Sequence, residues 1–343
     1  MSIDLHNTMS PRVAIVILNW NGREDTLECL ASVSQLDYPN YEIVVVDNGS
    51  TDDSVETISK QYPGIALVQT GSNLGYAGGN NVGIRWALDH AVDYVLLLNN
   101  DTIVSPDLLR AFVIAKDLLP ANAVLGAKIF FYDEPDKLWF AGGRWDDRSN
   151  SFKHVGLGQK DSTEFSRMTE VDYVTGCALF VSATAIKEIG LLDESFFLTY
   201  EETDWCYRAR ARGYKCIFVP DAKLWHKVSA SFGGNSSPLH NYFMVRNKLL
   251  WAKKHLSRSA RVSLLKENIR TLRGILLPRF ILFRTPLPFT KGLLWGFSSW
   301  LKAIKKNINN PINKSTLFGL RDYYLGRFGD CPEHVRKLAN PTA

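Results

Sequence analysis

The chain has 343 residues, of which 45% are hydrophobic and 22% charged, with a formal net charge of +5. This composition is typical of a folded protein with one large domain or two ordinary ones, and it excludes wholesale disorder. No run of about 18 uncharged apolar residues occurs, so no membrane-spanning helix is expected. The polar first ten residues and five scattered cysteines favour a reducing cytosol over secretion.

The charge is unevenly distributed along the chain. Between Arg246 and Lys306 there are fifteen Lys and Arg residues and one acid, Glu267, so this stretch carries +14 and leaves −9 for the rest. We therefore expect two surfaces with different partners, one near-neutral to acidic and one basic.

In the first third, short apolar runs alternate with helical stretches. This pattern predicts an α/β fold whose mostly parallel sheet has helices on both faces. Polar clusters follow the strands, and because ligands gather at the carboxyl ends of such strands, we expect the clusters to meet in one crevice. The predicted strands are 13–18, 41–46, 65–69 and 94–98, and the predicted helices are 23–35, 53–61 and 80–90.

The remainder of the chain is less regular. Residues 128–175 predict a hairpin-rich excursion, followed by helices over 182–188 and 200–212 and a strand over 216–220 that leads to His226. Beyond Pro238 the pattern is helical and basic, with breaks at the prolines 278, 286 and 288. We expect four regions: a flexible N-terminus (1–11), two halves of the sheet domain (12–105 and 106–237), and a basic amphipathic helical region (238–343).

Several polar residues are candidates for a site, and each has a simpler structural explanation. Asp47 ends a strand and could accept a hydrogen bond from a pyrimidine N–H, or simply form a turn. The glycine-rich segment 73–81 opens a helix, where backbone N–H groups could hold a phosphate. It matches neither a dinucleotide fingerprint nor a Walker loop, and the glycines could instead serve a left-handed backbone.

Two further groups suggest a metal and a base. Asp101 follows the most hydrophobic strand, where its carboxylate suits Mg²⁺ or Mn²⁺, and His226 could be an imidazole ligand or a structural histidine. Glu201, Glu202 and Asp204 open a helix, where acids favour the dipole and Asp204 could pair with Arg208. Two adjacent glutamates after an aromatic run could also supply a general base of raised pKa.

Taken together, these clusters resemble the family-2 glycosyltransferases of the GT-A fold, especially the bacterial rhamnosyltransferase-like branch. The resemblance extends from about Val13 to Asn247, and the late segment 323–329 also resembles that branch. It rests on VAIVILNWN (13–21), VVVDNGSTDDS (44–54), NLGYAGGNNVG (73–83), LLLNNDT (96–102), VTGCALFVS (174–182), LLDESFFLTYEETDWCYRARARGYK (191–215), WHKVSASFGG (225–234) and Arg246-Asn247.

The resemblance implies a role for each matching position. Residues 12–105 become the nucleotide-sugar-binding half and 106–237 the acceptor and catalytic half. The last acid of the Asp-x-Asp motif falls on Asp101, which would bind Mn²⁺ or Mg²⁺ with His226, whereas Asn99 replaces the first acid. The family's Glu-Asp pair falls on Glu201-Glu202, which favours Glu202 as base, with Glu201 and Asp204 close behind. The implied nucleotide-sugar contacts are Asn19, Asp47, Asn73, Leu74, Gly75, Asn99, Asn100 and Asp101, and the acceptor or sugar region is Thr175, Gly176 and Arg246.

The reaction that follows from this resemblance is an inverting, metal-dependent transfer of a sugar from a nucleoside diphosphate. The branch favours dTDP-L-rhamnose as donor and a cell-surface glycan or lipid-linked acceptor. A UDP-hexose donor and a catalytically inactive nucleotide-sugar-binding scaffold remain alternatives. A nucleotidyltransferase is disfavoured because no glycine-rich loop with a lysine follows the first strand.

The basic segment 272–306 interleaves cations with bulky apolar residues. Such a pattern is typical of interfacial helices, although an ordinary amphipathic cap remains an alternative. We expect a cytoplasmic protein bound peripherally to the inner face of the inner membrane. A nucleic-acid-binding protein would be basic too, but no RNA-binding aromatic motif is present, so no nucleic-acid partner is expected.

Overall fold

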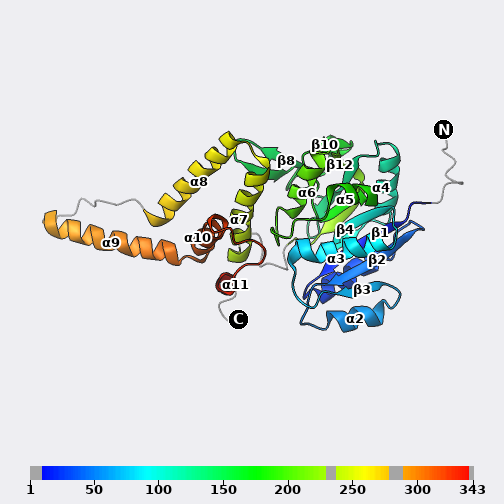
Figure 1. The fold of residues 1–343 in the computed structure, drawn as a ribbon, viewed down its shortest axis with the longest axis horizontal. Coiled ribbons are helices and arrows are strands. Elements are labelled where there is room, and N and C mark those ends of the chain that lie inside the picture. Colours follow the sequence, from blue (N-terminus) through cyan, green and yellow to red (C-terminus); the bar gives the residue numbers. More distant parts are fainter. Residues whose placement is uncertain (1–9, 229–236, 278–288, 340–343) are drawn as a thin grey trace. The chain divides into compact units, whose positions relative to one another are not determined.

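The computed structural model describes residues 10–228, 237–277 and 289–339 (Figure 1). The chain divides into two compact units, Met1–Ser231 and Phe232–Ala343. The first unit holds a mixed β-sheet with its helices, and the second is helical.

The central sheet of the first unit has the strand order β10-β12-β6-β11-β4-β1-β2-β3. Strands β3, β2, β1 and β4 run parallel to one another, as do β6 and β12, and β11 lies antiparallel between β4 and β6. The bounds are β1 Val13–Asn19, β2 Tyr41–Asp47, β3 Ala66–Gln69, β4 Tyr94–Asn99, β5 Thr102–Val104, β6 Ala123–Phe131, β7 Leu138–Phe140, β8 Gly143–Asp146, β9 Ser151–His154, β10 Thr169–Val171, β11 Ala178–Ser182 and β12 Lys215–His226.

Both faces of β1 are covered, because its side chains alternate between two helices. Val16 and Leu18 meet α3 at Gly83 and Gly79, while Asn19 on the opposite face bonds to Thr26 of α1. The predicted α/β sheet with helices on both faces is therefore confirmed. The helices of this unit are α1 Arg23–Val33, α2 Ser54–Gln61, α3 Gly75–Asp89, α4 Leu108–Asp117, α5 Ala183–Ile189 and α6 Glu201–Arg210, with a short 3₁₀ turn over Thr163–Phe165.

Two sequence-based boundaries were wrong. Helix α3 begins at Gly75 rather than Asn80, so most of the glycine-rich segment is helical instead of a loop. Strand β12 does not end at Pro220 but continues to His226, because a register shift against β6 between Val219 and Lys223 absorbs the proline in a bulge.

The second unit contains α7 Pro238–His255, α8 Arg258–Leu276, α9 Phe289–Asn309, α10 Pro311–Tyr324 and α11 Glu333–Ala339. Helices α7 and α10 are joined by buried polar contacts, such as Tyr242 donating to Asp322 Oδ2 at 2.8 Å. The predicted breaks at Pro278, Pro286 and Pro288 lie outside the described residues. Within the part of the chain that the structure describes, no helix combines the length and apolar content needed to cross a bilayer.

Candidate active site

The ends of β1 and β2 hold a buried polar cluster. Asn19 Nδ2 donates to Asp47 Oδ2 at 2.9 Å and to Ser50 Oγ at 3.1 Å, and the Ser50 N–H donates to Asp47 Oδ1 at 3.0 Å. Thr26 fixes the amide orientation by donating to Asn19 Oδ1. Asn19 and Asp47 therefore lie together at the carboxyl edge of the sheet, as the strand pattern predicted.

The next cluster joins the end of β2 to the start of α3. Asn48 donates to Asn73 Oδ1 at 3.2 Å and accepts from the Leu74 N–H at 3.0 Å. The Gly75 N–H donates to Asn73 Oδ1, and the Tyr76 N–H donates to the Phe197 carbonyl at 2.7 Å. Because these amides already have protein acceptors, the idea that this helix start holds a phosphate gains no support.

Asp101 and His226 are brought together by strand pairing. Asp101 lies between β4 and β5, and β5 pairs antiparallel with β12 so that Thr102 faces His226 in the ladder. The Lys227 N–H donates to the Asp101 carbonyl at 2.9 Å. As a result, His226 Nε2 lies 3.0 Å from Asp101 Oδ1, and both side chains are buried.

The charges in this pair stabilise each other. Burial raises the pKa of Asp101, but contact with His226 outweighs it and the net shift is downward. Burial lowers the pKa of His226, but Cys177 and the Asp101 carboxylate reverse this and raise it to about 10. The structure thus holds a negative carboxylate beside a positive imidazolium.

The donor set of this pair fits a divalent cation. An imidazole nitrogen and a carboxylate oxygen suit Mn²⁺, and His226 Nε2 and Asp101 Oδ1 lie side by side, 3.0 Å apart, in a buried position. Among all the residues that the structure describes, no three or more His, Cys, Asp or Glu side chains are grouped so that they could hold a metal ion. A cation held here would take its remaining ligands from water or a bound diphosphate.

Asn99 and Asn100 lie beside this pair, and the side chain of Asn100 contacts α1. Asn100 Nδ2 donates to Thr26 Oγ1 at 2.9 Å. The Asn99 carbonyl accepts from Thr102 Oγ1 at 2.7 Å, and its N–H donates to the Cys177 carbonyl. These bonds shape the turn that presents Asp101.

The two glutamates begin α6 after a strained turn. Phe197, Thr199 and Tyr200 all have positive φ, between 64° and 73°, which is uncommon outside glycine. Glu201 Oε2 and Glu202 Oε2 are buried without a hydrogen-bond partner in the described part of the chain. Such orphaned acceptors mark carboxyls poised to bind something else.

Burial changes the acidity of both glutamates. It raises the pKa of Glu202 to about 7, although backbone N–H groups at the start of the helix oppose the shift. Burial and the charge of Glu202 raise the pKa of Glu201 well above its usual range. A carboxyl that titrates near neutrality is suited to taking a proton from a hydroxyl.

Tyr76 connects the glutamates with the Asp101 side of the site. Burial raises the pKa of its phenol well above the usual value, and the charges of Glu201, Glu202 and Asp101 raise it further. Its hydroxyl donates to the Gly176 carbonyl at 2.7 Å. Thr175, next to Gly176, is buried and its hydroxyl accepts from the Cys177 N–H.

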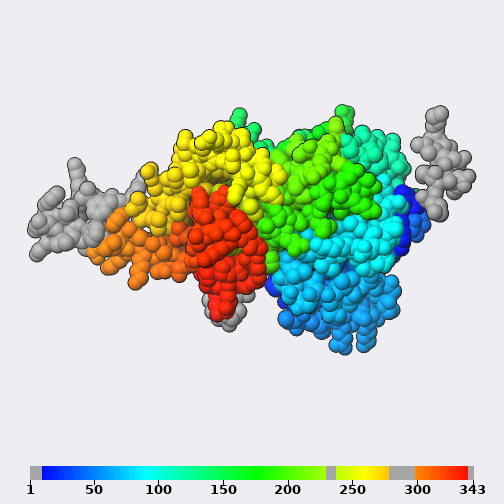
Figure 2. Space-filling model, viewed as in Figure 1, coloured from blue at the N-terminus to red at the C-terminus, as the bar shows by residue number. Residues whose placement is uncertain are grey.

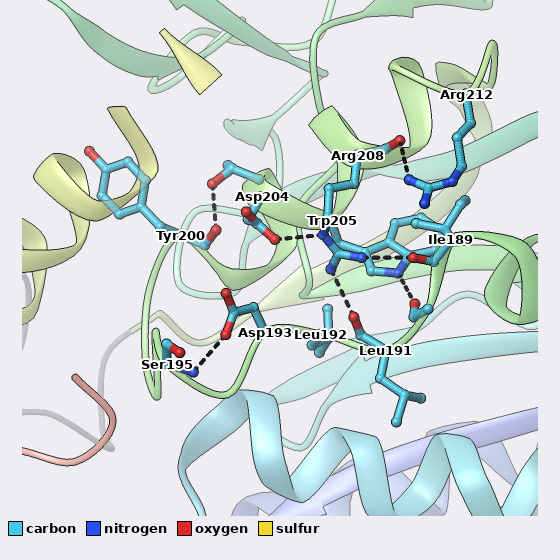
Figure 3. A network of polar contacts seen from close by, with 12 residues as sticks. Ile189, Leu191, Leu192, Asp193, Ser195, Tyr200, Asp204, Trp205, Arg208 and Arg212 are labelled. Atoms are coloured by element: carbon cyan, nitrogen blue, oxygen red, sulfur yellow. Dashed lines mark hydrogen bonds and ion pairs between the residues drawn. The ribbon is translucent and has the colours of Figure 1, made fainter. Parts of the chain in front are cut away.

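Asp204 belongs to a network of polar contacts with Arg208 (Figure 3). Its Oδ2 accepts from Arg208 Nε at 2.8 Å, and Arg208 also donates to the carbonyls of Ile189 and Leu191. Trp205 Nε1 donates to the Gly190 carbonyl in the same network. Asp204 therefore anchors α6 to the segment that follows α5.

Arg246 lies in the second unit, on α7. Its guanidinium is fully buried, stacks over the rings of Tyr242 and Phe243, and donates to Asn247 Oδ1 at 3.0 Å. This environment is a polar and aromatic network inside the helical unit.

Some site residues were missed by the sequence analysis. Lys227 Nζ forms ion pairs with Asp25 and Glu28 of α1, both at 2.7 Å. Tyr76 and Cys177 lie inside segments that the resemblance covers, so their motifs could have indicated them. The Lys227 partners are about 200 residues away and give no local signal.

Residues 14–190 match the family described as glycosyl transferase family 2. The chain is 28% identical over 271 residues to the low-salt glycan biosynthesis hexosyltransferase Agl10 of Haloferax volcanii, covering 74% of this chain and 80% of that protein. It is 25% identical over 265 residues to the dTDP-rhamnosyl transferase RfbF of Shigella flexneri, with coverages of 72% and 82%.

A further relative is the N-acetylglucosaminyl-diphospho-decaprenol L-rhamnosyltransferase of Mycobacterium tuberculosis, 27% identical over 225 residues, with coverages of 60% and 72%. Among solved structures, GalNAc-T7 with UDP, GalNAc and Mn²⁺ has a TM-score of 0.60 at 16% identity, covering 88% of this chain and 56% of that one. The mannosyltransferase PcManGT of Pyrobaculum calidifontis, with GDP-Man and Mn²⁺, has a TM-score of 0.53 at 15% identity, with coverages of 93% and 89%.

The fold is thus that of the GT-A glycosyltransferases. The chain belongs to glycosyl transferase family 2 and is an enzyme of the glycosyltransferase class.

Proposed function

We propose that this enzyme transfers a sugar, with inversion, from a nucleoside-diphosphate donor to a hydroxyl of a cell-surface glycan or a lipid-linked acceptor. The proposal is supported by the buried Asp101–His226 pair, 3.0 Å apart, together with the buried Glu201 and Glu202 oxygens, which have no hydrogen-bond partner among the described residues. A single displacement needs one base and one stabilised leaving group, and these residues can supply both.

The donor would bind at the carboxyl edge of the sheet. Asn19 and Asp47 would contact its base and ribose, and the segment of Asn73, Leu74 and Gly75 would line the pocket wall. Asn99 and Asn100 would keep the turn that aims Asp101 at the diphosphate. Asp101 and His226 would hold Mn²⁺ or Mg²⁺, which when bound stabilises negative charge on the leaving diphosphate.

On the acceptor side, Glu202 would remove the proton from the attacking hydroxyl. The acceptor oxygen then bonds to the anomeric carbon while the bond to the diphosphate breaks, and the diphosphate leaves with the electron pair. The proton remains on the Glu202 carboxyl until it exchanges with water. Glu201, whose pKa is raised well above its usual range, would stay protonated and leave the negative charge to Glu202. Asp204 would hold α6 in place, and Thr175, Gly176 and Arg246 would serve the acceptor or sugar.

The dTDP-L-rhamnose donor is favoured by the names of two relatives, a dTDP-rhamnosyl transferase and a decaprenol-linked rhamnosyltransferase. The second name also favours a lipid-linked acceptor, which would place the enzyme at the cytoplasmic face of the inner membrane. A UDP-hexose donor is the second candidate, because UDP accompanies GalNAc-T7.

Thermal-shift measurements with dTDP-, UDP- and GDP-sugars, each with and without Mn²⁺, test the proposal. We expect stabilisation by one nucleotide family that grows with Mn²⁺. Transfer or hydrolysis of that donor should then depend on Mn²⁺. No response to any nucleotide sugar would overturn the assignment, and donor binding without turnover would favour an inactive scaffold.

A further inference from the structure

Helix α8 presents an apolar surface that its own packing does not use. Val262, Leu265, Ile269 and Leu276 are each between 39% and 44% exposed. Their spacing of three, four and seven residues places them in one row along the helix, which we name the α8 stripe. Isolated exposed apolar residues are ordinary, but an aligned row indicates a binding surface.

The same helix already buries a different face. Leu264 and Ile275 are buried, and at 100° per residue they lie about a third of a turn from the stripe. Asn307 of α9 donates to the carbonyls of Gly274 and Ile275 beside that buried face. The α8 stripe is therefore a second apolar face rather than the edge of the helical core.

Cations border the stripe along one side. Lys266, Arg270 and Arg273 are exposed, and the helical spacing places them next to the apolar row. None of the three has an ion pair within the residues that the structure describes. The single acid of the helix, Glu267, lies nearly opposite the stripe and pairs with Lys248 at 3.2 Å.

We propose that the α8 stripe is the surface through which this chain binds an anionic lipid bilayer. The apolar side chains would enter the boundary of the acyl chains, while the three unneutralised cations would contact anionic headgroups. Net positive charge beside exposed apolar side chains is complementary to such a surface and repels a second copy of the same helix. The inference deepens the proposed function, because a lipid-linked acceptor requires an enzyme at the membrane.

The proposed surface differs from the segment that the sequence indicated. Most residues of the segment 272–306 have side chains that the structure does not describe. The α8 stripe begins ten residues before that segment, at Val262. In Figure 2 the yellow atoms that include α8 form part of the visible surface of the second unit.

Vesicle flotation of the full-length protein tests this inference. The probes are phosphatidylcholine vesicles with and without 30% phosphatidylglycerol, in roughly 0.1 M salt. Leu265→Gln with Ile269→Gln removes the stripe, and Lys266→Glu, Arg270→Glu and Arg273→Glu reverse its charged border. Matched controls in the first unit are Ile114→Gln with Leu118→Gln, both exposed apolar residues, and Lys60→Glu, Arg167→Glu and Lys187→Glu, all exposed cations.

We expect the wild type and both controls to float with the anionic vesicles only, and each α8 variant to bind them at least tenfold more weakly. Equal binding by wild type and α8 variants would overturn the inference. A lower melting temperature of the Leu265→Gln, Ile269→Gln variant would also overturn it, because the chain itself would then cover the stripe. A dimer that dissociates on this change would overturn it too, because a second copy would then cover the stripe. The nucleotide-sugar thermal shift is measured in parallel, so failure of the proposed function is seen separately from failure of membrane binding.

Discussion

His226 Nε2 lies 3.0 Å from Asp101 Oδ1, across 125 residues of sequence, because β12 pairs with the short β5 that follows Asp101. The pair is buried, and a positive imidazolium currently balances the carboxylate charge. A divalent cation would replace the imidazolium proton and bind both groups, so metal binding and proton release are linked at this position.

Asp101→Asn is expected to remove both metal dependence and transfer. The amide keeps the shape of the side chain but loses the charge that would hold a divalent ion, so the transfer rate should fall by about 100-fold or more. The thermal shift that Mn²⁺ gives in the presence of donor should also disappear. Asp53→Asn, an exposed carboxylate paired with Arg23, is the control, and an equal loss there would contradict the assignment.

Glu202→Gln tests the proposed base. The amide cannot take a proton, so transfer should fall by about 100-fold or more at saturating donor, with little change in donor affinity. Because burial raises the pKa of Glu202 to about 7, the wild-type rate should rise with pH through that value and then level off. A pH profile that keeps this inflection in the Glu202→Gln variant would show that another group is the base.

Stability should depend on pH through the same carboxyls. Burial raises the pKa values of Glu201 and Glu202 above those of the unfolded chain, so the folded state binds more protons and the free energy of unfolding falls as pH rises from about 4.5 toward 7. Urea denaturation at a series of pH values measures this slope. The slope should be smaller in Glu202→Gln, and an unchanged slope would mean that these carboxyls are not the cause.

Asp204→Asn should weaken the fold rather than the chemistry. The change breaks a buried ion pair with Arg208, whose other donors hold the carbonyls of Ile189 and Leu191, and we expect a loss of about 3 kcal/mol in stability. The remaining folded enzyme should transfer sugar within about tenfold of the wild-type rate. A stable variant with a rate loss as large as that of Glu202→Gln would instead make Asp204 a catalytic residue.

Gly75→Ala should disturb the contact between α3 and the turn before α6. Gly75 has φ +73°, and a Cβ there would lie 2.4 Å from the Phe197 carbonyl oxygen. Gly158 has φ +74° with nothing within 4 Å, so Gly158→Ala meets only the backbone penalty of about 1 kcal/mol. Gly75→Ala should be clearly less stable than Gly158→Ala in thermal melts, and equal melting temperatures would contradict the close contact.

The sheet and its polar edge were predictable from the sequence because each strand carries its own signal. A buried apolar run followed by Asn or Asp identified β1, β2 and β4, and their parallel pairing then brings Asn19 and Asp47 within hydrogen-bonding distance. The adjacent glutamates Glu201 and Glu202 were also predictable from a local signal, because acidic residues are favoured in the first turn of a helix.

The remaining features depend on contacts that no local pattern encodes. Gly75 and Gly78 resemble loop residues, yet the Phe197 carbonyl accepts from the Tyr76 and Ala77 amides and stabilises an earlier start of α3. Pro220 resembles a strand end, and only the register with β6 reveals that β12 continues. The ion pairs of Lys227 with Asp25 and Glu28 likewise arise from tertiary packing.

The bulge in β12 has a consequence for how the enzyme tolerates length changes. β12 pairs with β6 up to Val219 and again from Lys223, and residues 220–222 form the bulge between these two paired parts. The bulge therefore determines which side chains of the second part, 223–226, point to each face of the sheet. If one bulge residue is removed and the second part then shifts by one position on β6, its parity inverts: the imidazole turns away from the Asp101 carboxylate and Lys227 takes its position opposite Thr102. A shift of two positions restores the face but moves the imidazole about 7 Å along the strand, so changes of length here should be accepted only where the bulge absorbs them, however far they lie from the reacting sugar.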